Sequence, residues 1–273
     1  MWCGGLRGPL TSLLLRANAG GSMAHNGHIE HKHSDWPRRR VLQAGLAGAA
    51  LVPLLPLLST AWADDEVGWK HMFTEQGVAV WNRLEPGREV PVFKGIGMVD
   101  ASLFEVLAVL DDVSRHTDWM ANCTQAKILK QVGEFDRIMY NRTHAPWPVS
   151  DRDAVLNCTV DGSMSRREVL SPFASIASSL QPPIDGIVRM PRLRGFYKLT
   201  ATDDKHTRVT YQIDVDPGGH LPDFVVESTS RKLPLDTVTS LRRQVAKTRG
   251  RYEAFLAKYD PSHGGTIPLQ FQK

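Results

Sequence analysis

The sequence lacks the short motifs that most often mark a catalytic centre. Its 273 residues contain no G-x-S-x-G, H-E-x-x-H or C-x-x-C pattern. A serine nucleophile elbow, a zinc-protease helix and a dithiol redox centre are therefore not indicated. The six histidines after residue 63 show no spacing typical of metal ligands. We accordingly expect no metal, no cofactor and no catalytic residue.

The chain also lacks an excess of charge outside its first 63 residues. The net charge is +4, and residues 1–63 contain six of the basic residues and two of the acidic ones. The remaining 27 basic and 27 acidic residues balance. Nucleic-acid binding requires a concentration of basic residues, and the sequence therefore predicts no nucleic-acid partner.

Cysteine is scarce, and Cys123 and Cys158 are the two cysteines that follow residue 63. An oxidising compartment would permit them to pair. They fall on predicted strands that are not neighbours, which favours two free, buried thiols.

The N-terminal segment has the features of an export signal. Residues 37–63 read PRRRVLQAGLAGAALVPLLPLLSTAWA. Three arginines precede an apolar stretch, and Ala61 and Ala63 place small residues where a signal peptidase reads them. The RRRVLQ run resembles the twin-arginine signal, which exports folded proteins. Cleavage after Ala63 would make the mature protein periplasmic or secreted.

An uncleaved inner-membrane anchor is the alternative. The apolar run over 41–62 approaches the length of about 20 residues that spans a bilayer, but two glycines and two prolines interrupt it. The segment before the signal is long, and Met23 is a second possible start. His25, His28, His31 and His33 lie there, where a His-rich tract could bind metal, although solvated residues in a discarded segment are the simpler interpretation.

The patterns after residue 63 predict an α+β domain, in which a long final helix lies on one face of an antiparallel sheet. Period-2 alternation indicates strands, and Gly95-Ile96-Gly97 reads as strand glycines because the third glycine of a dinucleotide fingerprint is missing. Helical spacing indicates helices. The predicted helices are 65–75, 102–112 and 234–258; the predicted strands are 78–84, 90–99, 126–132, 137–143, 152–160, 167–171, 195–202 and 207–215; 161–163 is a tight turn and 260–273 a flexible tail.

Residues 145–155, APWPVSDRDAV, closely resemble the Pro-Trp-Pro-(aliphatic)-Ser-Asp-Arg-Asp signature of START domains, the steroidogenic acute regulatory protein-related lipid transfer family. Residues 216–224 resemble the family's segment before its C-terminal helix, and Asp118-Trp119 fits as well. The resemblance implies a helix-grip fold over 64–259, with a curved sheet around the last helix and an internal cavity. It implies binding of one lipid or other hydrophobic molecule. We expect the protein to be a monomer that makes transient contact with a membrane.

The signature itself is interpreted as having a structural role. Pro146 and Pro148 fix φ and donate no hydrogen bond, so this stretch leads into a strand. Trp147 lies between them. Asp151, Arg152 and Asp153 are expected to form a charged, hydrogen-bonded clamp between loop and sheet.

One departure from the family concerns the ligand. Sterol-carrying members commonly place an arginine six residues after the signature arginine, paired with an acid on the preceding strand. Cys158 occupies that position here, and the preceding strand offers no acid at 139, 141 or 143. The charged pair is thus absent or relocated, which disfavours a sterol. Alternation and helical spacing predict these cavity residues: Met139, Asn141, Leu156, Cys158, Tyr197, Tyr211, Ile213, Val238, Leu241 and Val245.

Two other functions compete with an exported lipid carrier or sensor. A polyketide cyclase or aromatase could use the same cavity, which rests on analogy of fold alone. An acid–base pair involving His144 or Asp153 would favour it, and His116 is a further candidate. An interaction module of an envelope complex would instead require a large exposed apolar patch.

Overall fold

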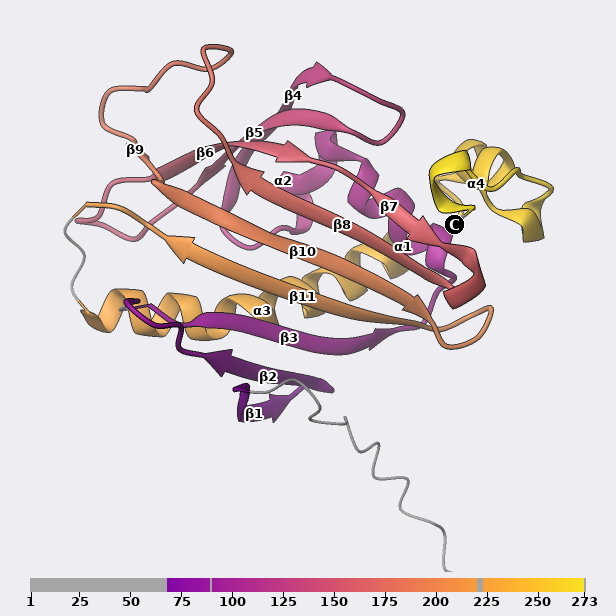
Figure 1. Ribbon diagram of the computed structural model, residues 1–273, viewed down its shortest axis with the longest axis horizontal. Helices are drawn as coiled ribbons and strands as arrows, with labels where there is room; N and C mark the ends of the chain where they lie inside the picture. The colour runs from indigo at the N-terminus through magenta and orange to yellow at the C-terminus, as the bar shows by residue number, and fades with distance from the viewer. Residues whose placement is uncertain (1–67, 89, 220–222, 273) are drawn as a thin grey trace, which may run out of the picture. The chain divides into compact units, whose positions relative to one another are not determined.

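A computed structural model describes residues 68–88, 90–219 and 223–272, and in that part of the chain an eleven-stranded, mostly antiparallel sheet predominates (Figure 1). These residues belong to one unit, Ala61–Lys273. The strands are β1 (Lys70–Glu75), β2 (Val78–Arg83), β3 (Val92–Val99), β4 (Cys123–Gln131), β5 (Arg137–Thr143), β6 (Arg152–Cys158), β7 (Asp161–Ser163), β8 (Glu168–Ser175), β9 (Val188–Arg189), β10 (Arg192–Ala201) and β11 (Thr207–Asp216). The helices are α1 (Leu103–Asp111), α2 (His116–Trp119), α3 (Asp223–Lys247) and α4 (Glu253–Tyr259).

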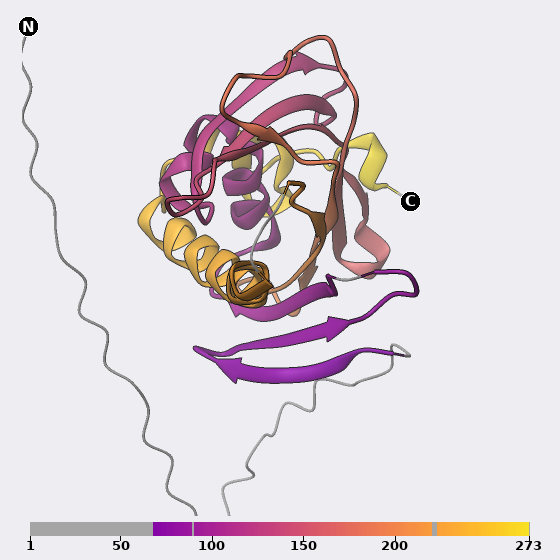
Figure 2. The same cartoon turned by 90° about the vertical axis from the view of Figure 1, so that its left-hand side faces the viewer.

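The sheet follows the order β1-β2-β3-β11-β10-β8-β6-β5-β4, with β7 paired to β8 and β9 paired in parallel to β6. Figure 2 looks nearly along α3, which lies with α1 on the concave side of the curved sheet. The α+β helix-grip architecture predicted from the sequence is confirmed. It leaves room between the sheet and the helices, and this is where the cavity lies.

The helix α1 starts at a capping box that the sequence encodes locally. The Ser102 side chain accepts from the Glu105 backbone N–H, and the Glu105 carboxylate accepts from the Ser102 N–H at 2.7 Å. This reciprocal pair satisfies two backbone donors that a helix start leaves free. The apolar face of α1, including Leu103, Val106 and Leu107, is buried in the main core.

Glycines on β3 allow α3 to approach the sheet closely. A Cβ on Gly95 would lie 2.8 Å from the Pro234 Cβ, and one on Gly97 would lie 2.8 Å from the Val238 Cγ1. The two strand glycines predicted from the sequence thus have a packing role.

We expect Gly95→Ala to destabilise the protein by about 1–3 kcal/mol, because the added methyl group must push α3 off β3 or distort one of them. The midpoint of urea unfolding measures this change. An unchanged midpoint would show that the helix can shift at little cost.

Several sequence predictions differ from the structure. Residues 70–75 form strand β1 rather than part of a helix, because the left-handed Gln76 and Gly77 turn the chain into a hairpin that pairs Glu75 with Val78. Residues 161–163 form β7 rather than a turn. The final helix is interrupted at Gly250, where φ is +76°, so α3 and α4 replace one continuous helix over 234–258.

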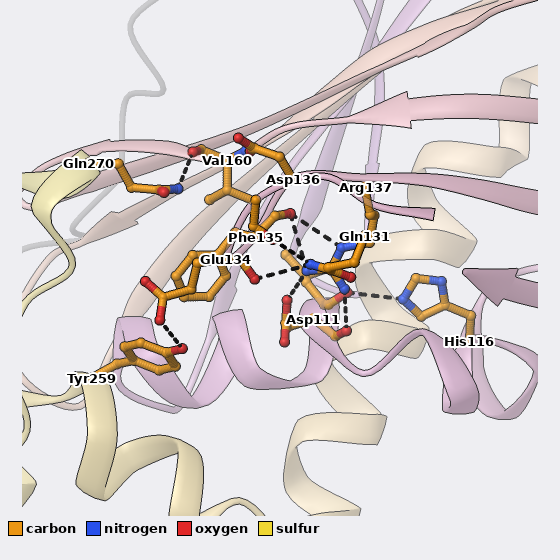
Figure 3. A network of polar contacts seen from close by, with 12 residues as sticks. Asp111, His116, Gln131, Glu134, Phe135, Asp136, Arg137, Val160, Tyr259 and Gln270 are labelled. Carbon is orange, nitrogen blue, oxygen red and sulfur yellow. Dashed lines mark hydrogen bonds and ion pairs between the residues drawn. The ribbon is translucent and has the colours of Figure 1, made fainter. Parts of the chain in front are cut away.

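Residues 260–272 differ from the expected flexible tail. They contain the 3-10 turns η3 (Pro261–His263) and η4 (Leu269–Phe271). Phe271 is fully buried and stacks on Phe135 with ring centroids 5.5 Å apart. The Gln270 Nε2 donates to the Val160 carbonyl at 2.6 Å (Figure 3). Burial of the Phe271 ring thus fixes the position of a segment for which proline and glycines had predicted a flexible tail.

The predicted export segment, residues 1–63, lies outside the described residues. Within the part of the chain that is described, no helix is long and apolar enough to cross a membrane.

Candidate functional site

A cavity of about 620 Å³ lies between the concave face of the sheet and the helices. This volume falls within the range of roughly 300–1,000 Å³ that is usual for small-molecule sites. Strands β5, β6, β8, β10 and β11 supply one wall, and α1, α2 and α3 supply the other. Most of the lining atoms belong to apolar side chains. The site can therefore accommodate a hydrophobic molecule.

Seven of the ten side chains predicted to line a cavity do so: Met139, Asn141, Leu156, Cys158, Tyr197, Tyr211 and Ile213. The strand alternation that predicted them holds, and Met139 faces Leu156 across β5 and β6. Val238, Leu241 and Val245 instead lie in the main core. These three residues lie on the side of α3 that packs on β3, where Val238 lies against Gly97. Leu233, Asp236 and Thr237 lie on the side that lines the cavity.

Three aromatic rings form a continuous part of the sheet wall. The Tyr197 and Tyr211 ring centroids lie 4.7 Å apart, and the Phe173 ring lies 6.0 and 6.4 Å from them. Burial raises the pKa of both tyrosines above the usual value. The phenols therefore remain neutral, which suits an apolar ligand.

An ion pair lies at the end of the cavity formed by α1 and β5 (Figure 3). The Arg137 Nη2 contacts the Asp111 carboxylate, and Nη1 donates to the Asp111 carbonyl at 2.9 Å. Nε and Nη2 donate to the Phe135 carbonyl at 3.2 Å. Every nitrogen of the guanidinium thus has a partner. Burial raises the pKa of Asp111, and the charge of Arg137 opposes that effect.

The Asp111–Arg137 pair bears on whether the family's charged pair, which is missing at Cys158, is absent or relocated. Arg137 is the cross-strand partner of Cys158, so the arginine stands on β5 and the acid on α1. The cavity retains a charged pair in a relocated form. Arg137 shares the alternation of Met139 and Asn141, and this signal could have identified it. Asp111 could not have been found that way, because only the packing of α1 on β5 brings it near.

His116 lies beside this pair on α2 and is 5% exposed. Its Nε2 lies 3.0 Å from the Leu110 carbonyl. A carbonyl only accepts, so Nε2 carries the proton. Burial lowers the pKa of His116 to about 4, so the ring is neutral at ordinary pH. Its Nδ1 is therefore an acceptor, and it has no partner among the described residues.

Two other polar groups of the cavity, Asn141 and Cys158, are weakly engaged or inert. The Asn141 amide donates to the Met120 sulfur at 3.5 Å, and its Oδ1 has no partner in the described part of the chain. Burial raises the pKa of the Cys158 thiol to about 12, which keeps the thiol protonated at neutral pH. Cys158 and Cys123 are free thiols, as the sequence predicted, but both residues are partly exposed rather than buried.

The signature loop, residues 144–151, lines part of the cavity. Asp151 accepts from the Arg142 Nε at 2.8 Å and from the Ala145 N–H at 3.2 Å. The Arg152 guanidinium contacts the Ser150 and Gly218 carbonyls. The bond between Trp147 and Pro148 is cis, and the Trp147 side chain is 92% exposed. Pro146, Val149 and Arg152 also line the cavity.

Asp153 is 1% exposed and lies in a bidentate ion pair with Arg189, whose Nε and Nη2 donate at 2.6 and 3.1 Å. Arg189 is a partner that the sequence did not reveal, because the two-residue strand β9 carries it. His144 contacts Asp151 at 3.0 Å rather than Asp153. The acid–base pair was expected to involve His144 or Asp153: His144 contacts an acid but has a largely exposed side chain, and Asp153 is held by an arginine. The described residues contain no cluster of three or more His, Cys, Asp or Glu side chains suited to a metal.

Comparison with known proteins agrees with this architecture. Residues 57–248 match the START domain family. An uncharacterized protein of Pseudomonas aeruginosa is 31% identical over 214 residues, covering 77% of this chain and 97% of that protein. The structure of a STAR-related lipid transfer protein from Xanthomonas axonopodis is 28% identical, with a TM-score of 0.60, over 66% of this chain and 99% of that one. Human STARD10 shares the fold at 22% identity, with a TM-score of 0.64, over 72% and 81% of the two chains.

Proposed function

The chain belongs to the START domain family, and from this premise we propose that it is an exported carrier that holds one lipid-sized hydrophobic molecule in its cavity. The observation that carries the proposal is the 620 Å³ cavity itself, which is largely apolar in lining and enclosed by sheet and helices. Burying an alkyl chain gains about 0.8 kcal/mol per methylene group. Binding of this kind needs no catalytic group.

Native mass spectrometry tests this proposal most directly. The full chain is expressed in its own host, recovered gently from the periplasm, and weighed before and after extraction into organic solvent. We expect a monomer that begins at Asp64 and carries one lipid-sized adduct. A lipid-free mass, together with no binding of the neutral hydrophobic dye Nile red, would contradict the carrier. Recovery in the cytoplasm with residues 1–63 attached would contradict export.

Filling the cavity should remove binding without unfolding the protein. Cys158→Trp places a large ring among Leu156, Phe173 and Arg137, and we expect the Nile red affinity to fall at least about tenfold, or roughly 1.4 kcal/mol. Asn157→Trp is the matched control, because the neighbouring Asn157 is exposed on the other side of β6. Equal affinities for the two variants would place the ligand elsewhere.

Delivery to a membrane would use the loops at the cavity opening. Trp147 on the β5–β6 loop is 92% exposed, and Leu180 and Ile184 on the β8–β9 loop are 46% and 37% exposed. The two loops lie at the same end of the sheet (Figure 1). They are joined by the Val188 N–H, which donates to the Asp151 carbonyl at 2.9 Å. Exposed apolar side chains beside a cavity suit contact with a bilayer.

We therefore expect Trp147→Ala to slow the transfer of Nile red from loaded protein to vesicles of phosphatidylethanolamine and phosphatidylglycerol. A slowing of about tenfold corresponds to roughly 1.5 kcal/mol of lost burial in the bilayer. The dye affinity should stay unchanged, because Trp147 does not line the cavity. Transfer at the original rate would exclude this loop from the membrane contact.

A further inference from the structure

Two buried acceptors among the cavity-lining residues, the Nδ1 of His116 and the Oδ1 of Asn141, have no donor within the described part of the chain. His116 is 5% exposed, and its Nε2–H is committed to the Leu110 carbonyl at 3.0 Å. The remaining ring nitrogen, Nδ1, has no partner within the described residues. An unpaired buried polar atom costs about 1–3 kcal/mol. A donor supplied by the ligand would remove that cost.

The surroundings of His116 decide what kind of donor fits. The charge of Arg137 acts on the His116 ring, but four of the five guanidinium N–H groups already donate to Asp111 and to the Phe135 carbonyl. The Asp111 carboxylate contributes a negative charge at the same end. An anionic group placed there would meet the Nδ1 lone pair and the Asp111 carboxylate, against at most one remaining N–H of the Arg137 Nη1.

From this arrangement, which rests on the proposed function, we propose that the ligand carries a neutral hydrogen-bond donor, such as a hydroxyl group, that donates to the Nδ1 of His116. The rest of the ligand then extends along the apolar wall of Phe173, Tyr197 and Tyr211 toward the opening. The Asn141 amide, with its Oδ1 also without a partner in the described part of the chain, offers a second polar contact on β5. We expect carboxylate and phosphate groups to bind less favourably at this end, beside the Nδ1 lone pair and the Asp111 carboxylate.

Competition against Nile red tests the proposal with three probes of one chain length. Tetradecanol has the donor, tetradecyl methyl ether lacks it, and myristate is an anion. At pH 7.5 we expect tetradecanol to bind about fivefold more tightly than the ether, as one net hydrogen bond provides. Myristate should bind more weakly than either. Equal affinities of alcohol and ether, or a preference for myristate, would overturn the inference while leaving the carrier intact.

Two substitutions test whether the preference for the alcohol over the ether arises at His116. His116→Phe keeps a planar ring and removes the acceptor, so the alcohol should lose its advantage while the ether retains its affinity. Met139→Leu is the matched control, because it alters the wall without altering hydrogen bonding and should change both affinities by the same factor. The ratio within each variant does not depend on how much of the protein is folded. An alcohol preference that persists in His116→Phe would overturn the assignment.

A second measurement needs no variant. In wild-type protein labelled with ¹⁵N-histidine, the Nδ1 resonance of His116 should move on addition of tetradecanol and stay in place on addition of the ether. Identical spectra with both probes would contradict a hydrogen bond to this nitrogen. Failure of Nile red and of all three probes to bind would instead count against the carrier function itself.

Discussion

Replacing Arg189 with methionine is expected to lower the free energy of unfolding by about 3–5 kcal/mol, the usual cost of leaving one member of a buried ion pair without its partner. Asp153 is 1% exposed and both of its oxygens bind Arg189. Once the arginine is removed, the carboxylate has neither a counter-ion nor access to water. Urea unfolding at pH 7.5 measures the loss.

Arg194 provides the matched control. It also binds a buried aspartate, since its Nε donates to Asp214 at 2.7 Å. Asp214 however retains Arg88 and Arg192 as partners, so Arg194→Met should cost far less. The double variant Arg189→Met with Asp153→Leu should be more stable than Arg189→Met alone, because no buried charge is then left unpaired. Equal losses for Arg189→Met and Arg194→Met would refute this account of the signature aspartate.

Acidification should destabilise the protein through His116. Its pKa is about 4 in the folded state because of burial, against about 6.5 in an unfolded chain. The unfolded state therefore binds the proton more readily. The stabilising contribution is complete above pH 6.5 and is lost as the pH falls toward 4. Linkage gives a loss of about 2.5 kcal/mol from this residue between pH 7.5 and pH 4.5.

The difference between wild type and His116→Phe isolates this contribution. Both proteins lose stability in acid through their other groups, but only the wild type should lose the additional amount. Unfolding in urea at the two pH values provides the comparison, and titration of the His116 ring by NMR provides the pKa. Equal pH dependence of the two proteins, or a His116 pKa near 6.5, would contradict the prediction.

The signature over 145–155 and the order of the elements were enough to predict the family and the helix-grip fold. Alternation along β5, β6, β10 and β11 also identified the sheet wall of the cavity, because successive side chains of a strand point to opposite faces. The same argument was less successful for α3. Its apolar stripe predicted Val238, Leu241 and Val245 for the cavity, but an apolar stripe does not reveal whether a sheet or a cavity faces it.

The local errors have a similar origin. The spacing of Trp69 and Met72 fitted a helix, and only the hairpin at Gln76 and Gly77 with its pairing to β2 made this segment a strand. Proline and glycine after residue 260 suggested a free tail, but Phe271 finds an aromatic cluster around Phe135. In each case contact with another segment, adjacent in the sequence for β1 and distant for Phe271, outweighed the local preference of the chain.

The sequence by itself determined the family, the fold class, the apolar character of the sheet wall and the absence of the usual arginine at Cys158. Only the tertiary structure decided the polar end of the cavity. Asp111 reaches Arg137 because α1 packs against β5, and Asp153 pairs with Arg189 on β9. The Leu110 carbonyl accepts from the Nε2 of His116, whose Nδ1 has no partner among the described residues. These partners are 26, 36 and 6 residues apart. Pairings between elements depend on where the chain returns in space, which periodicity within one element does not encode.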